Sequence, residues 1–293
     1  MEEKNNGINI DYDYNKLRES VRHRPGMFFG STDLCGLQNA IMDLVYHCIE
    51  NQKHDIDIVI NRPDITVGHE GETLAPNFYT DVVRSACETF DYQNNQYQFR
   101  FDNKIFENIE PNHDVLFDAL RELAFLNKLL KIRLNGHCFC YENGLMDFYQ
   151  YLKIKAGLYW HERHQPIGFY TKEGDMEMDA VFAAAHLFDP CIFSFVNNCR
   201  TQDNGAHVNG FLKGLREEAD KYKQNSSERM KIIRNDGIGL IIHIKTPTPQ
   251  YSGATKREII NREVYQFVKR ATKENAGRIF AENPDMALTY IKW

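Results

Sequence analysis

The spacing of the hydrophobic residues constrains the fold most strongly, because it switches repeatedly between the period of a helix and that of a strand. In the first half, the expected helices are 36–50, 113–128 and 145–152, and the expected strands are 55–60, 97–101, 131–134 and 137–141. The last two strands flank Asn135-Gly136, the strongest short signal for a β-hairpin. Helices and strands are therefore interleaved in one domain.

The second half has a different order of elements. Its expected strands are 166–171, 176–185, 192–199 and 239–245, and its expected helices are 206–222 and a helical region from about Lys256 to the end. The change of order predicts two α+β domains that meet near residue 153.

The N-terminal region precedes the first clear amphipathic helix. Residues 1–16 are polar and are expected to form an extended arm, with a helix starting near Tyr14. Arg24–Gly30 contains one proline and two glycines, which predicts a turn.

Composition excludes several classes of protein. No apolar run approaches the ~20 residues of a transmembrane helix, and the first residues lack the apolar core of a secretory signal. Seven cysteines at irregular spacing argue against a disulfide framework and for a reducing, cytoplasmic setting. We therefore expect a cytoplasmic protein without membrane contact.

Charge argues against direct DNA binding. The formal net charge is −6, whereas proteins that grip duplex DNA usually carry a basic footprint. One local basic stretch contains Lys269, Arg270, Lys273 and Arg278, and on a helix it is expected to be a solvated face. DNA contact is expected to be indirect only.

Four stretches resemble motifs of one family. Residues 21–32, VRHRPGMFFGST, are similar to its V-R-K-R-P-G-M-Y-I-G-S-T signature, and residues 120–128 match its L-R-E-L-A-F-L-N-K segment. Residues 193–211 resemble its S-F-V-N-N…G-G-T-H-x-x-G-F run, and residues 247–256 resemble its P-x-P-x-F-x-x-Q-T-K loop. The family is that of the gyrase B and topoisomerase IV B subunits, and the resemblance runs from about residue 17 to residue 285.

The resemblance implies an α+β fold, namely a GHKL (Bergerat) α/β sandwich followed by a transducer domain like ribosomal S5 domain 2. The expected division is an arm at 1–16, a GHKL ATPase-like domain at 17–153 and a transducer domain at 154–293. The family continues into a TOPRIM metal domain, whose acidic cluster is not found in this sequence. We therefore expect a truncated relative that cannot cut or rejoin DNA alone.

The residues at the family's hydrolytic positions have changed. The resemblance places Asp43 at the position of the glutamate general base and His47 at that of the asparagine that helps to hold Mg²⁺. Aspartate is one methylene shorter, and a misplacement of about 1 Å can cost on the order of 10²-fold in rate. Imidazole is a poor ligand for hard Mg²⁺, which prefers oxygen.

The adenine-binding motif is changed as well. In the family's D-x-G-x-G pattern, His69 stands at the aspartate, Gly71 at the first glycine and Thr73 at the second. Neutral histidine can accept a hydrogen bond on one nitrogen only, and a buried donor left unpaired costs roughly 1–3 kcal/mol.

The glycine-rich lid that holds the phosphates in this family is missing. No glycine occurs between Ala75 and Phe101, so the backbone there cannot wrap closely around phosphate. Residues 77–90 are interpreted as the helix that follows the deleted lid. In the transducer loop, Lys256 stands at the γ-phosphate lysine, but its glutamine partner is Ala254.

These changes favour a pseudo-ATPase that acts as a dimerising or regulatory binding protein, either as a homodimer or paired with a gyrase B-type subunit. No cofactor is expected to act, and ATP and Mg²⁺ are implied by the resemblance alone. The alternative is a divergent ATP-hydrolysing subunit of a type II topoisomerase, with TOPRIM on another chain and Asp43 as a weaker base. A third hypothesis is that Asp43, His47 and His69 bind a transition metal, because an aspartate and two histidines are plausible ligands.

Overall fold

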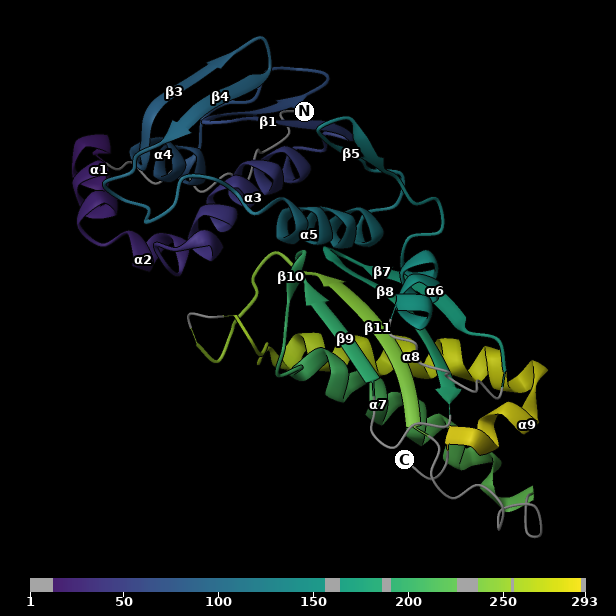
Figure 1. Cartoon of the computed structure of the whole chain (residues 1–293). Helices are drawn as coiled ribbons and strands as arrows, with labels where there is room; N and C mark the ends of the chain where they lie inside the picture. The colour runs from purple at the N-terminus through teal and green to yellow at the C-terminus, as the bar shows by residue number, and fades with distance from the viewer. Residues whose placement is uncertain (1–12, 156–163, 186–190, 226–236, 254–255, 291–293) are drawn as a thin grey trace, which may run out of the picture. The chain divides into compact units, whose positions relative to one another are not determined.

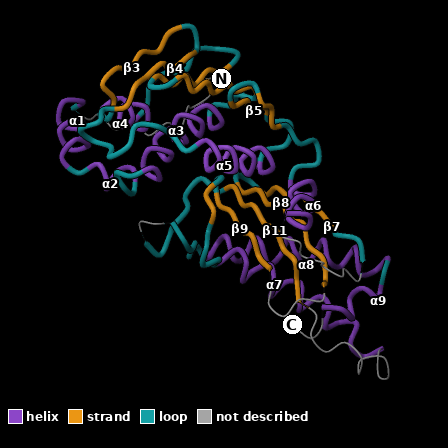
Figure 2. Tube along the Cα trace, viewed as in Figure 1, coloured by secondary structure: helices purple, strands orange, loops and turns teal. Residues whose placement is uncertain are grey.

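The computed structural model describes residues 13–155, 164–185, 191–225, 237–253 and 256–290. The chain forms two compact units, Met1–Glu142 and Asn143–Trp293. Each unit has its own sheet, and Figures 1 and 2 show the elements of both.

The first unit pairs a mixed sheet with helices. Its helices are α1 (Tyr14–His23), α2 (Pro25–Phe29), α3 (Leu34–Glu50), α4 (Phe78–Ser85) and α5 (His113–Leu126). Its strands are β1 (Asp55–Asn61), β2 (Asp64–His69), β3 (Cys87–Gln93), β4 (Gln96–Phe101), β5 (Lys131–Leu134) and β6 (His137–Phe139). The six-stranded sheet has the order β3-β4-β2-β1-β5-β6, in which only the β1–β5 pair is parallel.

Helices α3 and α5 cover one face of this sheet (Figure 1). The core between them contains Leu37, Ile41 and Leu44 of α3 and Leu120 of α5, all with no exposed side chain surface. Asp33 caps α3 by accepting hydrogen bonds from the Cys35 and Gly36 backbone N–H groups. The amphipathic pattern predicted for residues 36–50 is thus confirmed.

The hairpin predicted at Asn135-Gly136 is also confirmed. Both residues have positive φ, 48° and 83°, as a two-residue turn of type I′ requires. Strands β5 and β6 pair antiparallel on either side of it.

Two expectations for the first unit are wrong. Arg24–Gly30 is not a simple turn, because Pro25 begins the short helix α2, where its missing N–H is tolerated, and Gly30 ends it at φ 82°. The helix expected over residues 77–90 stops at Ser85, and Cys87 begins strand β3, which pairs with β4.

The second unit packs a five-stranded sheet against two long helices. Its strands are β7 (Ile167–Glu173), β8 (Met176–Ala185), β9 (Cys191–Val196), β10 (Cys199–Arg200) and β11 (Gly237–Lys245), in the order β10-β9-β11-β8-β7. Its helices are α6 (Leu145–Lys155), α7 (Ala206–Ala219), η1 (Asp220–Asn225), α8 (Arg262–Glu282), α9 (Pro284–Ala287) and η3 (Leu288–Tyr290).

Helices α7 and α8 lie side by side against one face of the second sheet (Figure 1). Glycine permits their close approach, because a Cβ added to Gly214 would lie 2.6 Å from the Lys269 carbonyl oxygen. Helix α6 packs on the opposite face, where the Phe148 ring lies 6.2 Å from that of Phe193. This packing agrees with the grouping of α6 in the second compact unit, Asn143–Trp293.

Three further expectations are corrected. The strand expected over 192–199 is two strands, because Asn197 and Asn198 turn the chain at φ 46° and 67°. The long helix begins at Arg262 rather than near Lys256, because Ile259 forms bridges with Gly205 and Tyr251. The helix expected to start near Tyr14 is confirmed as α1, so residues 14–16 are helical and not part of an extended arm, and residues 1–12 lie outside the described part of the chain.

Candidate functional site

Four of the predicted site residues lie in the first unit. Asp43 and His47 are one turn apart on α3 and therefore share a helix face. His69 ends β2 on the face that carries Ile65 and Val67 towards α3, and Gly71 lies in the turn that follows. Asp43 is half-buried, whereas His47 and His69 are only 4% and 8% exposed.

The imidazole of His47 is held by two amides. Its Nδ1 accepts hydrogen bonds from Asn51 Nδ2 at 3.2 Å and from Asn77 Nδ2 at 2.9 Å. Because Nδ1 accepts, the proton of the neutral ring is on Nε2, which is buried and has no hydrogen-bond partner among the described residues. Burial lowers the pKa of His47, and the Ala75 carbonyl acts in the opposite direction.

The imidazole of His69 is held by a tyrosine. The Tyr92 hydroxyl lies 2.9 Å from His69 Nε2, and the Leu74 backbone N–H donates to the same hydroxyl at 2.9 Å. Because Leu74 N–H can only donate, the hydroxyl proton is available for His69 Nε2. Burial lowers the pKa of His69, which favours this neutral acceptor.

The Tyr92 ring stacks on the Tyr97 ring, and each of the two tyrosines lies near one of the histidines. Tyr92 and Tyr97 are cross-strand partners in β3 and β4, with ring centroids 4.3 Å apart. Tyr97 lies edge-on to His47 at 6.4 Å, and Tyr92 lies 6.2 Å from His69. His47 and His69 therefore each have a tyrosine ring packed near them, and the two tyrosine rings stack on one another.

Sequence reasoning missed Tyr92 and Tyr97. A signal was present, because Phe90 and Tyr92 alternate before Asn94-Asn95, and Tyr97 and Phe99 alternate after it. Both asparagines have positive φ, 52° and 62°, as in a two-residue hairpin turn.

The turn that contains Gly71 is tied to the same hairpin. Asn95 Nδ2 donates to the Gly71 carbonyl at 2.6 Å, and Thr73 Oγ1 donates to Asn95 Oδ1 at 3.0 Å. Gly71 has φ 91°, and a Cβ added there would lie 3.5 Å from Lys53 Nζ. The turn thus makes its hydrogen bonds within the unit.

The structure does not support the metal hypothesis. Within the described ranges, no group of three or more histidine, cysteine or acidic residues is arranged to hold a metal ion. His47 Nδ1 and His69 Nε2 are already hydrogen-bonded to side chains, so these nitrogens are not open to a metal. Asp43, His47 and His69 do not form a ligand set.

A cavity of about 190 Å³ lies beside Tyr92 and Tyr97 and is lined by residues of α4 and of the β3–β4 hairpin. Six of its lining residues are Thr80, Asp81, Arg84, Phe90, Tyr92 and Tyr97. Sites for cofactors and drug-sized ligands usually enclose about 300–1,000 Å³. This cavity is too small for a nucleoside triphosphate.

Lys256 belongs to the second unit. It is exposed and has φ 53°, and its backbone N–H donates to the Gly253 carbonyl at 3.2 Å. The next residue, Arg257, pairs with Asp203 through two hydrogen bonds of 2.7 and 2.8 Å.

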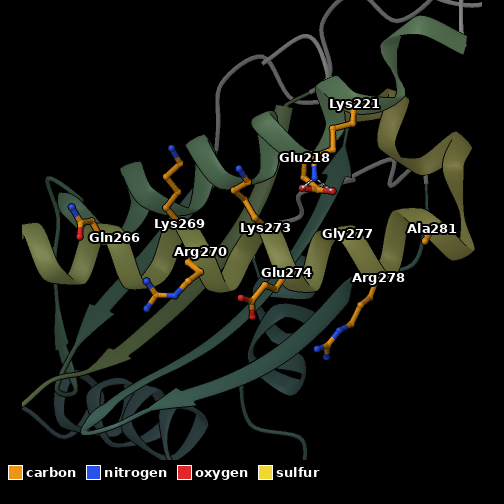
Figure 3. Close-up of a pocket in the computed structure, with 10 residues that line it drawn as sticks. All are labelled: Glu218, Lys221, Gln266, Lys269, Arg270, Lys273, Glu274, Gly277, Arg278 and Ala281. Atoms are coloured by element: carbon orange, nitrogen blue, oxygen red, sulfur yellow. Dashed lines mark hydrogen bonds and ion pairs between the residues drawn. The ribbon is translucent and has the colours of Figure 1, made fainter.

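The basic stretch on α8 lines a groove of about 910 Å³ along α7 and α8 (Figure 3). Lys269 and Lys273 bind the carboxylate of Glu217 at 2.7 and 3.1 Å. These two lysines hold the pKa of Glu217 down at about 2, and Arg270 pairs with Glu173. Most of these cations are thus paired within the unit, as expected for a solvated face.

We expect Tyr92→Phe to lower the free energy of unfolding of the first unit by about 1–3 kcal/mol, because it leaves Leu74 N–H and His69 Nε2 without their partner. Urea unfolding at pH 7.5 measures this change. Tyr79→Phe on the exposed side of α4 is the matched control and should change stability by less than about 0.5 kcal/mol. Equal effects of the two substitutions would contradict the role given to the Tyr92 hydroxyl.

Residues 144–293 match the family described as DNA gyrase B. The DNA gyrase B protein of Haloferax lucentense is 31% identical over 207 residues, which cover 65% of this chain and 32% of the relative. The corresponding protein of Myxococcus xanthus is 29% identical over 356 aligned residues, which cover 92% of this chain and 43% of the relative. The chain thus spans less than half the length of these relatives.

Solved structures show the same fold. The 43K ATPase domain of Thermus thermophilus gyrase B, solved with an aminocoumarin, superposes with a TM-score of 0.77 at 19% identity and covers 94% of this chain and 93% of that one. The gyrase B structure from Myxococcus xanthus gives 0.78 at 17% identity, with 94% and 100% covered. The expected GHKL-type ATPase fold is therefore confirmed. In the described ranges, no helix has the length and apolarity needed to cross a membrane.

Proposed function

The chain belongs to the DNA gyrase B family, and we propose that within it the protein is a pseudo-ATPase that acts as a dimerising or regulatory binding protein. The single observation that carries this proposal is the Tyr92 hydroxyl, which occupies both His69 Nε2 and the Leu74 N–H. By resemblance, His69 stands at the position that reads adenine. An internal side chain thus takes the hydrogen bonds that a ligand would need there.

The phosphate side of the site supports the same proposal. Phosphate binding by a loop needs free backbone N–H groups that converge on one point. Between β2 and β3 the chain forms a short turn and helix α4, whose first N–H groups are capped by the Asn77–Thr80 capping box. The alignment with the Myxococcus relative is longer than this chain, 356 positions against 293 residues, which agrees with segments having been lost here.

The hydrolytic residues give further support. His47 presents a buried N–H on Nε2 and a doubly hydrogen-bonded Nδ1, so neither nitrogen is placed to hold Mg²⁺. Magnesium prefers oxygen ligands in any case. With base, metal and adenine positions all altered, the fold remains as a scaffold for binding other proteins.

We propose that the partner is a second copy of this chain or a gyrase B-type subunit. Light scattering of the protein alone, and of a mixture with the ATPase–transducer region of a gyrase B protein, tests this directly. We expect a stable dimer in one of the two samples without nucleotide, and a changed ATP turnover of the gyrase B protein in the mixture. Monomers in both samples, or ATP turnover by this chain alone, would contradict the proposal and favour a divergent ATPase.

A further inference from the structure

Two exposed cysteines lie close together at β6, outside the candidate site. Cys138 belongs to β6 and Cys140 directly follows it, and both carry free, exposed thiols. Free cysteine is otherwise among the most buried residue types. Phe139 between them is only 1% exposed and packs in the core of the first unit. The alternation of a strand therefore places both thiols on the solvent side of the sheet.

The hairpin holds the two thiols at a spacing that suits one metal ion. Phe139 pairs with Ile132 of β5, which has no exposed surface, so the strand is fixed between the two cysteines. Residues two apart on a strand have Cα atoms about 6.6 Å apart. Sulfurs bound to one tetrahedral zinc ion at about 2.3 Å lie about 3.8 Å from each other. Two cysteine side chains that lean together span this difference.

One chain supplies only half of a zinc site here. Structural zinc takes four ligands, and Cys138 and Cys140 are two. The neighbouring His137 lies on the opposite face, where its ring centroid is 4.8 Å from those of Phe117 and Phe139. Among the residues that the structure describes, no group of three or more potential ligands exists. The other two ligands must come from a second chain.

The backbone at β6 is placed to receive a second chain. β6 is the last strand of its sheet in the described part of the chain, and His137 flanks the two-residue turn. In such a hairpin the bonded pairs alternate, starting with the residues that flank the turn. The Tyr141 carbonyl continues this alternation by accepting from the Leu129 N–H at 3.3 Å. The N–H and C=O groups of Cys138 and Cys140 are therefore directed at the free edge.

Antiparallel pairing of two β6 edges brings four thiols together. With a twofold axis at Phe139, Cys138 of each copy lies opposite Cys140 of the other, with Cα atoms about 5.5 Å apart. The four thiols then occupy the corners of a small rectangle on one face. Lys131 and Arg133 of β5 share this face, and Arg133 is the cross-strand partner of Cys138. Their positive charges offset the net negative charge of four thiolates around one zinc ion.

We propose that two copies of the chain join edge to edge at β6 and hold one zinc ion between them with Cys138 and Cys140 of each copy. Zinc binding and pairing are coupled, because either copy alone presents only two ligands. The four thiols lose their protons on binding, since the thiolate is the ligand. The inference goes beyond the proposed function and uses no residue of the candidate site.

The purified chain is compared with and without Zn²⁺, in the presence of a phosphine reductant that excludes a disulfide-linked dimer. Bound zinc is counted after dialysis, the mass is followed by light scattering, and hydrogen exchange is measured for a peptide that contains residues 137–141. The double variant Cys138→Ser/Cys140→Ser removes the ligands at exposed positions, where substitutions rarely disturb folding. Cys35→Ser, at an exposed cysteine of α3, is the matched control.

We expect one zinc ion for every two chains and a doubling of the mass of whichever species is present without zinc. The peptide should exchange at least about tenfold more slowly with zinc, because its free amides become bonded. Cys35→Ser should behave as wild type, and the double variant should show none of these effects.

Wild type that binds no more zinc than the double variant, or one zinc ion per chain with an unchanged mass, would overturn the proposal. A doubled mass with unchanged exchange of the peptide would overturn the pairing through β6. A chain that dimerises without zinc and binds none would overturn this inference and leave the proposed function standing, so the two failures are distinguishable.

Discussion

Gly36→Ala is expected to destabilise the first unit by about 3 kcal/mol or more, at the upper end of the overpacking range. A Cβ at this position would lie 2.0 Å from the Ser31 carbonyl oxygen and 2.6 Å from the Ser31 carbonyl carbon, so the backbone itself must shift. Gly36 is buried in the first turn of α3, the helix that carries Asp43 and His47. Urea unfolding followed by circular dichroism measures the loss.

Gly26→Ala is the matched control, since Gly26 is also helical but a Cβ there meets nothing within 4 Å. Alanine in an open helical position should be neutral or should stabilise by up to about 1 kcal/mol. If the Gly36→Ala protein were as stable as the Gly26→Ala protein, the close contact between the Ser31 backbone and Gly36 of α3 would be contradicted.

The second unit is expected to lose stability as the pH falls, because of His207. This side chain has no exposed surface, its Nε2 lies 3.3 Å from Thr201 Oγ1, and its Nδ1 has no partner in the described part of the unit. Burial lowers the pKa of His207 from 6.5 to about 3. The unfolded chain therefore takes up the proton first, so the stabilisation is complete above pH 6.5 and is lost as the pH falls towards 3.

Between pH 7.5 and pH 5 the loss should be about 2 kcal/mol, and it should continue to grow below pH 5. Hydrogen exchange of peptides from β8 and β11 reports on this unit by itself. In His207→Gln, which cannot be charged, the fall between the two pH values should be much smaller. An unchanged slope in the variant would show that another group controls the acid response.

In the first unit, elements with local sequence signals were predicted correctly, whereas a strand defined by tertiary pairing was not. Helix α3 and the Asn135-Gly136 hairpin were predicted because their signals are local, namely a helical stripe and a turn dipeptide. Strand β3 was missed because the spacing of Val82, Val83 and Ala86 continues a helical pattern. Pairing with β4, a tertiary interaction, decides the conformation from Cys87 onwards.

Two of the errors have one physical cause. Asn94-Asn95 and Asn197-Asn198 each turn the chain with two residues at positive φ. Asparagine tolerates this left-handed region better than other residues with a side chain. An Asn-Asn pair between alternating segments therefore indicates a hairpin, as Asn-Gly does.

The roles given to the candidate site residues stay predictions. The family resemblance singled out His47 and His69, and in the structure Tyr97 lies near His47, Tyr92 lies near His69, and the two tyrosine rings stack. That a tyrosine would bond His69 could not be predicted, because it depends on the register of β3 against β4 and on the fold of residues 70–77. The metal hypothesis failed because proximity of ligand types on one helix face does not fix the direction of each nitrogen.

The central claim is that Tyr92 closes the family's nucleotide site, and calorimetric titration with a non-hydrolysable ATP analogue and Mg²⁺ tests it most directly. The mass of the protein is followed by light scattering in the same samples. The account predicts no heat of binding and the same mass with and without the analogue. Saturable binding, or a shift from monomer to dimer driven by the analogue, would show that the site still works as a nucleotide switch and would contradict the account.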